Sequence, residues 1–179
     1  MNVLTPLHRR FAAALALAMT GFALSAAPAT ATVTTTSIVT AAAPAQQTVS
    51  PLERIRGMDP QTYERKVRRQ INKKRANHNL SRVKGNACAA RIAQDWSDYL
   101  APRFEFFHQD LSPFFKKCNT TYAGETLARG AITPKRMVRL WMESPGHRRI
   151  LLSKSPRKVG LGATLDPRGD WVVTADFIR

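Results

Sequence analysis

Two histidines and one glutamate, His108, Glu125 and His147, are the residues in this sequence best suited to chemistry. Two imidazoles and a carboxylate are sufficient ligands for zinc when water takes the fourth position. The same groups could transfer protons, because histidine titrates near neutral pH. Their spacing lacks the H-E-x-x-H pattern that places two zinc ligands on one helix. From the residues alone, metal or small-ligand binding, catalysis, and a structural hydrogen bond between His147 and Glu125 all stay open.

A serine nucleophile is a further option, because Ser144 lies close to His147 in the sequence. The surrounding residues do not form G-x-S-x-G, and Pro145 has no N–H to contribute to an oxyanion hole. Serine followed by proline is instead typical of a helix start. We therefore place Ser144 at a helix N-cap and reject it as a nucleophile.

Two short helices are predicted around His147. The first begins at Thr133 and shows one apolar face, formed by Met137, Val138, Trp141 and Met142. Proline disfavours helical dihedrals in the residue before it, so this helix should stop near Glu143 and a second should run to about Leu152. Gly146, beside His147, would let a backbone or a ligand approach closely.

The remaining patterns predict an α+β fold. Residues 63–76 form a helix with a narrow apolar stripe and basic residues on its other faces, and 86–100 form a second helix that Pro102 ends. Residues 123–128 form a short strand. Apolar alternation over 159–165 and 171–177, separated by the turn residues 166–170, predicts an antiparallel hairpin.

Several of these segments together resemble bacterial members of the CAP superfamily (cysteine-rich secretory, antigen 5 and pathogenesis-related proteins, or SCP domains). The matching motifs are FFH ending at His108, GET at 124–126, WMESPGHRRIL at 141–151 and VGLG at 159–162, with Asn72 and Arg75 fitting an N-x-x-R in the first helix. The match covers roughly residues 63–179. The resemblance implies an α-β-α sandwich and a cavity containing His108, Glu125 and His147, which in some members holds a divalent cation such as zinc.

Two departures from the family pattern concern the cavity. Many eukaryotic members carry a second glutamate where this chain has Ser144, and the nearby Glu143 lies one helical step away, on a different face. Glu143 is therefore left open as a fourth group. Thr126 stands where an amide is usual.

The N-terminus has the pattern of a secretory signal peptide, residues 1–31. Two arginines precede a short apolar run and a stretch of small residues. The apolar run is short for a membrane anchor. We expect a flexible linker over 32–59, a CAP/SCP domain over 60–179, and a secreted protein.

The two cysteines, Cys88 and Cys118, predict a disulfide, because an even number of cysteines in an oxidising compartment usually pairs. Such a bridge would stabilise the fold by roughly 3 kcal/mol in the chain-entropy model. A metal site or catalytic thiol is the alternative, but neither cysteine belongs to a C-x-x-C motif.

The chain carries a formal net charge of +16, from 28 Lys and Arg against 12 Asp and Glu. Such a charge favours anionic partners, and secretion favours envelope polymers or a membrane surface over nucleic acid. We expect a monomeric binding module whose His/Glu cleft takes a lipid, a peptide or a divalent cation. The alternatives are a metal-dependent hydrolase of peptide or cell-wall material, and an envelope adhesion protein held by charge.

Overall fold

The computed structural model describes residues 49–179. The predicted signal peptide, 1–31, and linker residues 32–48 lie outside them. The described chain forms, in order, α1 (Pro51–Arg56), α2 (Pro60–Ala76), β1 (Lys84–Gly85), α3 (Ala87–Arg103), α4 (Ser112–Lys117), β2 (Ala123–Gly130), α5 (Pro134–Glu143), α6 (Pro145–Leu151), β3 (Lys158–Leu165) and β4 (Trp171–Ile178). No helix in this part of the chain combines the length and the apolarity that a membrane crossing requires.

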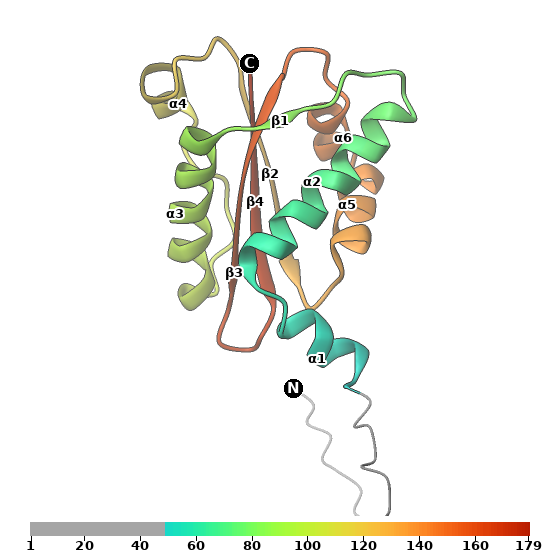
Figure 1. The fold of residues 1–179 in the computed structure, drawn as a ribbon. Coiled ribbons are helices and arrows are strands. Elements are labelled where there is room, and N and C mark those ends of the chain that lie inside the picture. Colours follow the sequence, from blue (N-terminus) through green and yellow to red (C-terminus); the bar gives the residue numbers. More distant parts are fainter. Residues whose placement is uncertain (1–48) are drawn as a thin grey trace, which may run out of the picture. The chain divides into compact units, whose positions relative to one another are not determined.

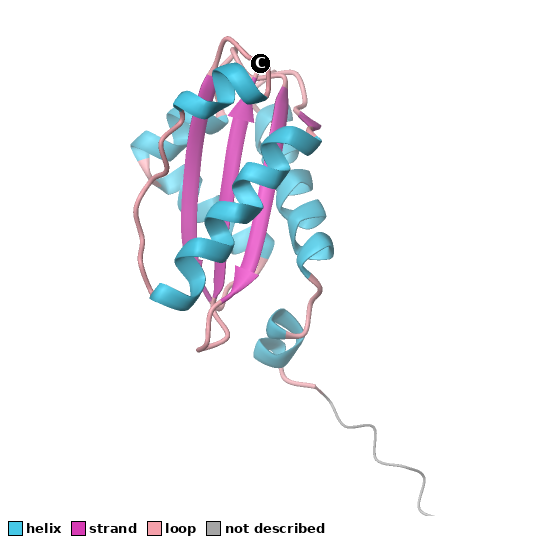
Figure 2. Ribbon diagram, turned by 90° about the vertical axis from the view of Figure 1, so that its left-hand side faces the viewer, coloured by secondary structure: helices cyan, strands magenta, loops and turns pink. Residues whose placement is uncertain are grey.

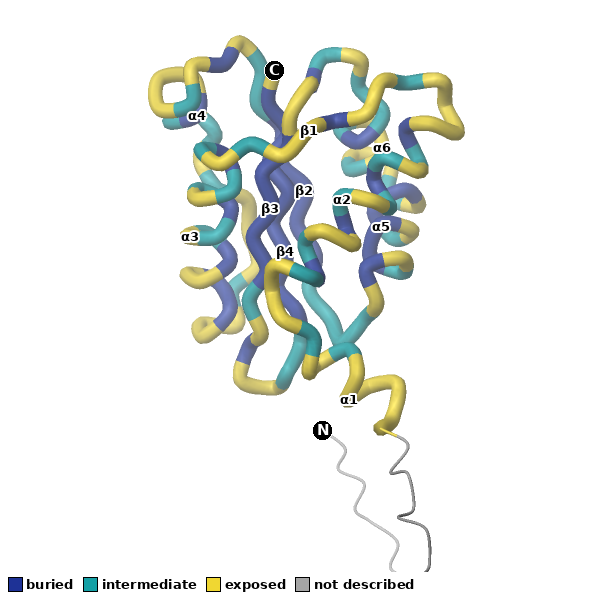
Figure 3. The backbone as a smooth tube through the Cα atoms, in the orientation of Figure 1, coloured by how far each residue is buried: buried dark blue, intermediate teal, exposed yellow. Residues whose placement is uncertain are grey.

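A four-stranded sheet with the strand order β1-β3-β4-β2 forms the centre of the domain (Figure 1). β3 and β4 form the predicted antiparallel hairpin, with Leu165 opposite Trp171. β2 pairs with β4 in antiparallel orientation, and the short β1 runs parallel to β3. Every residue of β4 is buried (Figure 3), because helices cover both faces of the sheet.

The helices form two layers, α3 and α4 on one side of the sheet and α2, α5 and α6 on the other (Figures 1 and 2). The predicted α-β-α sandwich is thereby confirmed. On the α3 side, contact depends on the absence of side chains. A Cβ atom at Gly160 would lie 2.1 Å from the backbone carbon of Ala89, and one at Gly162 would lie 2.3 Å from the carbonyl oxygen of Ala93. These glycines therefore let α3 lie directly on β3.

Large side chains fill the opposite side of the sheet. The ring of Tyr63 on α2 stacks on that of Trp171, with 4.4 Å between their centroids. The indole N–H of Trp141 on α5 donates to the carbonyl oxygen of Leu127 at 3.1 Å. Because these rings stand between the sheet and the helices, α2 and α5 lie further from the strands than a glycine contact would allow.

Two polar residues of α2 hold the chain that follows it. Asn72 both donates to and accepts from the backbone of Val83, at 3.0 and 2.8 Å. Arg75 is fully buried, although its charge grouped it with the basic residues outside the apolar stripe of this helix. Its guanidinium donates to the carbonyl oxygens of Ser81, Leu151 and Ser153 at 2.7–2.9 Å. A buried cation needs such partners, and here they are backbone carbonyls at the end of α6 and in the loop after α2.

The boundaries of α5 and α6 match the prediction. Thr133 caps α5, since its hydroxyl accepts from the backbone N–H of Arg136 at 3.2 Å. Ser144 is the N-cap residue of α6, but its side chain makes no capping hydrogen bond. No backbone of the described residues approaches Gly146 closely, because a Cβ atom there would meet nothing within 4 Å; the approach of a ligand stays a prediction.

Part of the predicted linker is folded. α1 lies within 32–59 and starts with a capping box, in which the side chains of Ser50 and Glu53 bond each other's backbone N–H groups. The indole N–H of Trp171 donates to the carbonyl oxygen of Ile55 at 3.0 Å. The guanidinium of Arg56 donates to the backbone carbonyl oxygen of Arg168 at 2.9 Å. These bonds to the β3–β4 turn explain why this charged segment folds.

The predicted disulfide between Cys88 and Cys118 is present and joins the first turn of α3 to the residue after α4. α3 runs one residue beyond Pro102, to Arg103. Proline is tolerated there because the last turn loses only one N–H bond, and Phe104 then ends the helix in the left-handed region, with φ 55°.

Candidate functional site

The structure brings His108 and Glu125 into direct contact. Glu125 lies on β2, and its side chain is only 2% exposed, whereas that of His108, in the segment between α3 and α4, is 60% exposed. The Nδ1 atom of His108 bonds Oε1 of Glu125. When the carboxylate accepts this bond, Nδ1 carries the proton, and in the neutral ring Nε2 is left as an acceptor.

Gln109 and Asp176 extend this contact into a chain of hydrogen bonds. The side-chain amide of Gln109 donates to Oε2 of Glu125 at 2.6 Å and to Oδ2 of Asp176 at 3.0 Å. The two carboxyl groups lie opposite each other in the β2–β4 register. Burial and, to a smaller extent, the charge of Glu125 raise the pKa of Asp176 to about 8, against the lowering effect of the Gln109 bond.

Neither Gln109 nor Asp176 was among the residues predicted for the site. Alternation along β4 placed Asp176 on the face opposite to that of Ala175 and Phe177, and a hairpin commonly leaves such a face in solvent. α3 covers that face here, so the carboxyl group is buried. Gln109 could have been found only as the neighbour of His108, because a single glutamine belongs to no recognisable sequence motif.

His147 lies near the pair without bonding to it. It stands in the first turns of α6, and its ring centroid is 6.2 Å from that of His108. Burial, and then the proximity of His108, lower the pKa of His147. Glu125 therefore has His108 and Gln109 as partners, in place of the bond to His147 that the sequence left open.

A cavity of about 350 Å³ opens beside the pair, at the β2 edge of the sheet. Because Gly124 has no side chain, the side chains of Tyr122 and Ile150 can lie close to β2. A Cβ atom at Gly124 would lie 3.1 Å from the Tyr122 hydroxyl and 3.3 Å from a methyl carbon of Ile150. The cavity thus has one polar end and mainly apolar walls. Its lining residues are His108, Leu111, Tyr122, Ala123, Gly124, Glu125 and Ile150.

The side chains do not fit a bound metal ion. Residues 49–179 contain no group of three or more His, Cys, Asp or Glu placed to hold one. Both oxygens of Glu125 are already engaged by His108 and Gln109. Glu143, the open fourth group, is exposed and lies 3.7 Å from Arg136 and 3.8 Å from Arg139. A cation on His108 and His147 therefore finds no completed set of ligands in the described residues.

The arrangement is suited to hydrogen bonding and to accepting a proton. A carboxylate behind an imidazole fixes its tautomer and orientation, as in a general base. Within the described part of the chain, no serine, threonine or cysteine lines the cavity, and both cysteines are in the disulfide. A proton acceptor without a neighbouring nucleophile is better suited to binding a ligand donor than to acyl transfer.

Comparison with solved structures agrees with the fold. An outer surface protein of Borrelia burgdorferi has a TM-score of 0.60 at 19% identity, covering 68% of this chain and 96% of that one. An extracellular SCP-domain protein of Bacillus anthracis has a TM-score of 0.60 at 20% identity, covering 73% and 44%. A cysteine-rich secretory protein of Staphylococcus aureus has a TM-score of 0.57 at 21% identity, covering 68% and 40%.

The sequence comparisons identify the family. The uncharacterized protein YkwD of Bacillus subtilis is 32% identical over 107 residues, which are 56% of this chain and 42% of YkwD, so the match spans less than half of that relative. Residues 68–177 match the family described as "CAP: Cysteine-rich secretory protein family". This match covers more than half of the chain, and the chain therefore belongs to the CAP, or cysteine-rich secretory protein, family.

Proposed function

We propose that this protein is a secreted bacterial binding module whose cavity at His108 and Glu125 takes a small amphipathic ligand, a lipid or a peptide. The observation that carries the proposal is the contrast within the cavity. A buried carboxylate holds an exposed imidazole at one end, and mainly apolar residues form the rest of the wall. A ligand with a polar donor and an apolar body matches both ends.

Within the cavity, Nε2 of His108 would accept a hydrogen bond from a hydroxyl or amide of the ligand. The bond between Nδ1 and Glu125 holds the ring in the tautomer that this requires. Leu111 and Ile150 would contact the apolar body of the ligand. His147, held neutral by its lowered pKa, lies close enough to His108 to border a larger ligand.

Three observations support secretion. The first 31 residues have the pattern of a signal peptide. The Cys88–Cys118 disulfide is typical of an oxidising compartment. Structurally similar proteins are described as an outer surface protein and as an extracellular protein.

Binding is favoured over metal-dependent hydrolysis because the ligand set for a metal is incomplete in the described residues. Glu125 already bonds His108 and Gln109, so it is not free to serve as a third ligand beside His108 and His147. The retained ligand classes are therefore those that add a bond at His108 Nε2 without displacing Nδ1 from Glu125.

The test measures binding of two uncharged probes, monolauroylglycerol and an N-acetylated, C-amidated trialanine, by NMR shift mapping on protein expressed from the full chain. At least one probe should shift resonances of Leu111, Tyr122 and Ile150. Glu125→Gln should weaken that binding about tenfold, because the imidazole loses its fixed tautomer. The control is Glu143→Gln, which alters an exposed carboxylate elsewhere and should have no effect.

Two results would refute the proposal. One is the absence of shifts at the cavity with both probes. The other is stoichiometric zinc binding that both His108→Ala and His147→Ala abolish, which would make the site a metal centre after all.

A further inference from the structure

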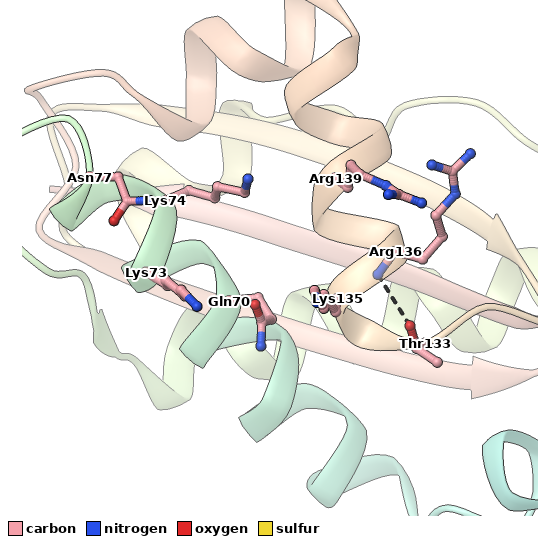
Figure 4. Close-up of a pocket in the computed structure, with 8 residues that line it drawn as sticks. All are labelled: Gln70, Lys73, Lys74, Asn77, Thr133, Lys135, Arg136 and Arg139. Atoms are coloured by element: carbon pink, nitrogen blue, oxygen red, sulfur yellow. Dashed lines mark hydrogen bonds between the residues drawn. The ribbon is translucent and has the colours of Figure 1, made fainter.

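A second hollow lies away from the His108–Glu125 cavity, between α2 and α5. It has a volume of about 310 Å³ and is lined from both helices (Figure 4). α2 supplies one wall and the first turns of α5 supply the other. Its lining residues are Gln70, Lys73, Lys74, Asn77, Thr133, Lys135, Arg136 and Arg139.

The charge of this hollow has one sign. Its lining includes three lysines and two arginines and no carboxylate from the described residues. A neighbouring hollow of about 280 Å³ shares Gln70, Thr133 and Lys135 and adds two more cations, Lys66 and Arg69. The two hollows therefore form one basic groove along α2. From Lys66 to Asn77 it extends about 16 Å at the rise of an α-helix.

The lysines of the groove are free to bind. Arg136 and Arg139 both approach Glu143 on α5, which offsets part of their charge. Lys73, Lys74 and Lys135 take part in none of the ion pairs found in residues 49–179. In Figure 4 the side chain of Lys74 extends from α2 towards α5. Like charges that converge from two helices repel each other, and an anion between them relieves this cost.

The groove is held rigidly in this arrangement. The opposite side of α2 is anchored in the core by Tyr63, Val67 and Ile71, all fully buried. Thr133 caps α5 beside the groove and fixes its first turn. The backbone that carries the cations is therefore fixed before an anion binds, and only side-chain freedom is lost on binding.

From this geometry we infer that the groove binds a linear polymer that carries phosphate groups along its length. The groove is elongated, so it fits several anionic groups in a row better than a single small anion. Arginine and lysine both pair strongly with phosphate oxygens. A membrane surface fits less well, because the exposed aromatic residues that would enter it lie across the sheet, on α3, on α4 and in the segment between them: Tyr99, Phe104, Phe106, Phe107 and Phe115.

The test measures binding of a short inorganic polyphosphate by calorimetry, with protein expressed from the full chain. The groove variant is Lys73→Gln with Lys74→Gln and Lys135→Gln. The matched control, Lys116→Gln with Lys117→Gln and Lys154→Gln, removes the same charge from exposed positions elsewhere. We expect the groove variant to weaken binding at least about tenfold and the control less than about threefold. Rising salt should weaken binding by the wild type more steeply than binding by the groove variant.

Four results would overturn the inference. Equal losses in the two variants would show attraction by overall charge, and unchanged affinity in both would place the site elsewhere. Polyglutamate binding as tightly as polyphosphate would remove the preference for phosphate. Binding of phosphatidylglycerol vesicles in the absence of polyphosphate binding would make the groove a membrane contact. Equal melting temperatures of the two variants would confirm that both fold, and monolauroylglycerol binding reports separately on the cavity at His108.

Discussion

The two faces of the sheet are packed in opposite ways. On the α3 face, glycines and alanines bring the helix backbone onto the strand, and the side chains between them include polar ones. Ser97 on α3, for example, donates to the carbonyl oxygen of Gly162 and to the Thr174 hydroxyl, both at 3.0 Å. On the opposite face, large rings hold α2 and α5 away from the strands. The buried guanidinium of Arg75 donates there to the backbone carbonyl oxygen of Leu151.

This difference explains where the two candidate sites lie. Glu125 and Asp176 share the α3 face, where Gln109 can bridge them. The disulfide, at the other end of the segment that follows α3, holds it near this face. On the other face, bulky side chains lie between the sheet and the helices α2 and α5, and basic residues line the hollow between these helices. Close packing thus accompanies the buried acidic site, and wide packing accompanies the open basic one.

The largest effect should come from adding a side chain at the close contact between α3 and β3. In Gly162→Val the new side chain would meet the backbone of Ala93 and Gln94, which cannot move without shifting α3. We expect a loss of about 3 kcal/mol or more in the free energy of unfolding, measured by urea denaturation. The control is Gly146→Ala, which meets open space within a helix and should be neutral or stabilising by up to about 1 kcal/mol. A loss below about 1 kcal/mol in Gly162→Val would show that the contact is not tight.

A smaller loss is expected from the cation on the opposite face. Arg75→Met keeps much of the side-chain volume but leaves the carbonyl oxygens of Leu151 and Ser153 without their donor. The free energy of unfolding should fall by about 2 kcal/mol, because removing a buried charge offsets part of the lost bonding. Arg69→Met, on an exposed residue of the same helix, should change it by less than about 0.5 kcal/mol. Equal effects of the two substitutions would mean that the bonds of Arg75 to the backbone carbonyl oxygens do not stabilise the fold.

The sequence predicted what depends on local pattern. Proline and threonine marked the boundaries of α5, alternation marked the hairpin, and cysteine count marked the disulfide. The sequence did not predict the burial of a residue where that burial depends on which other element covers it. Periodicity groups Arg75 with the buried stripe of α2 as well as with its basic neighbours, and only the position of α6 decides between them. The same limit hid Asp176, whose face is buried because α3 lies on it.

Asp176 also gives the finest test of the difference between the faces, through the pH dependence of stability. Burial and Glu125 raise the pKa of this carboxyl from 3.8 to about 8 in the folded protein. Between these values the unfolded chain has released the proton while the folded chain keeps it. Unfolding therefore releases a proton, and this group makes stability fall as pH rises from about 4 to about 8.

In Asp176→Asn that contribution disappears, because the amide does not titrate and still bonds Gln109. The free energy of unfolding of the variant should therefore gain on that of the wild type as pH rises, with the difference levelling off above about pH 8. Urea denaturation at several pH values measures this slope. Asp110→Asn serves as the control, since that exposed carboxyl has a pKa lowered by its bonds to Ser112 and is already ionised over this range. Parallel pH profiles for wild type and Asp176→Asn would show that the α3 face leaves Asp176 ionised, and the buried acidic site would then carry two charges side by side.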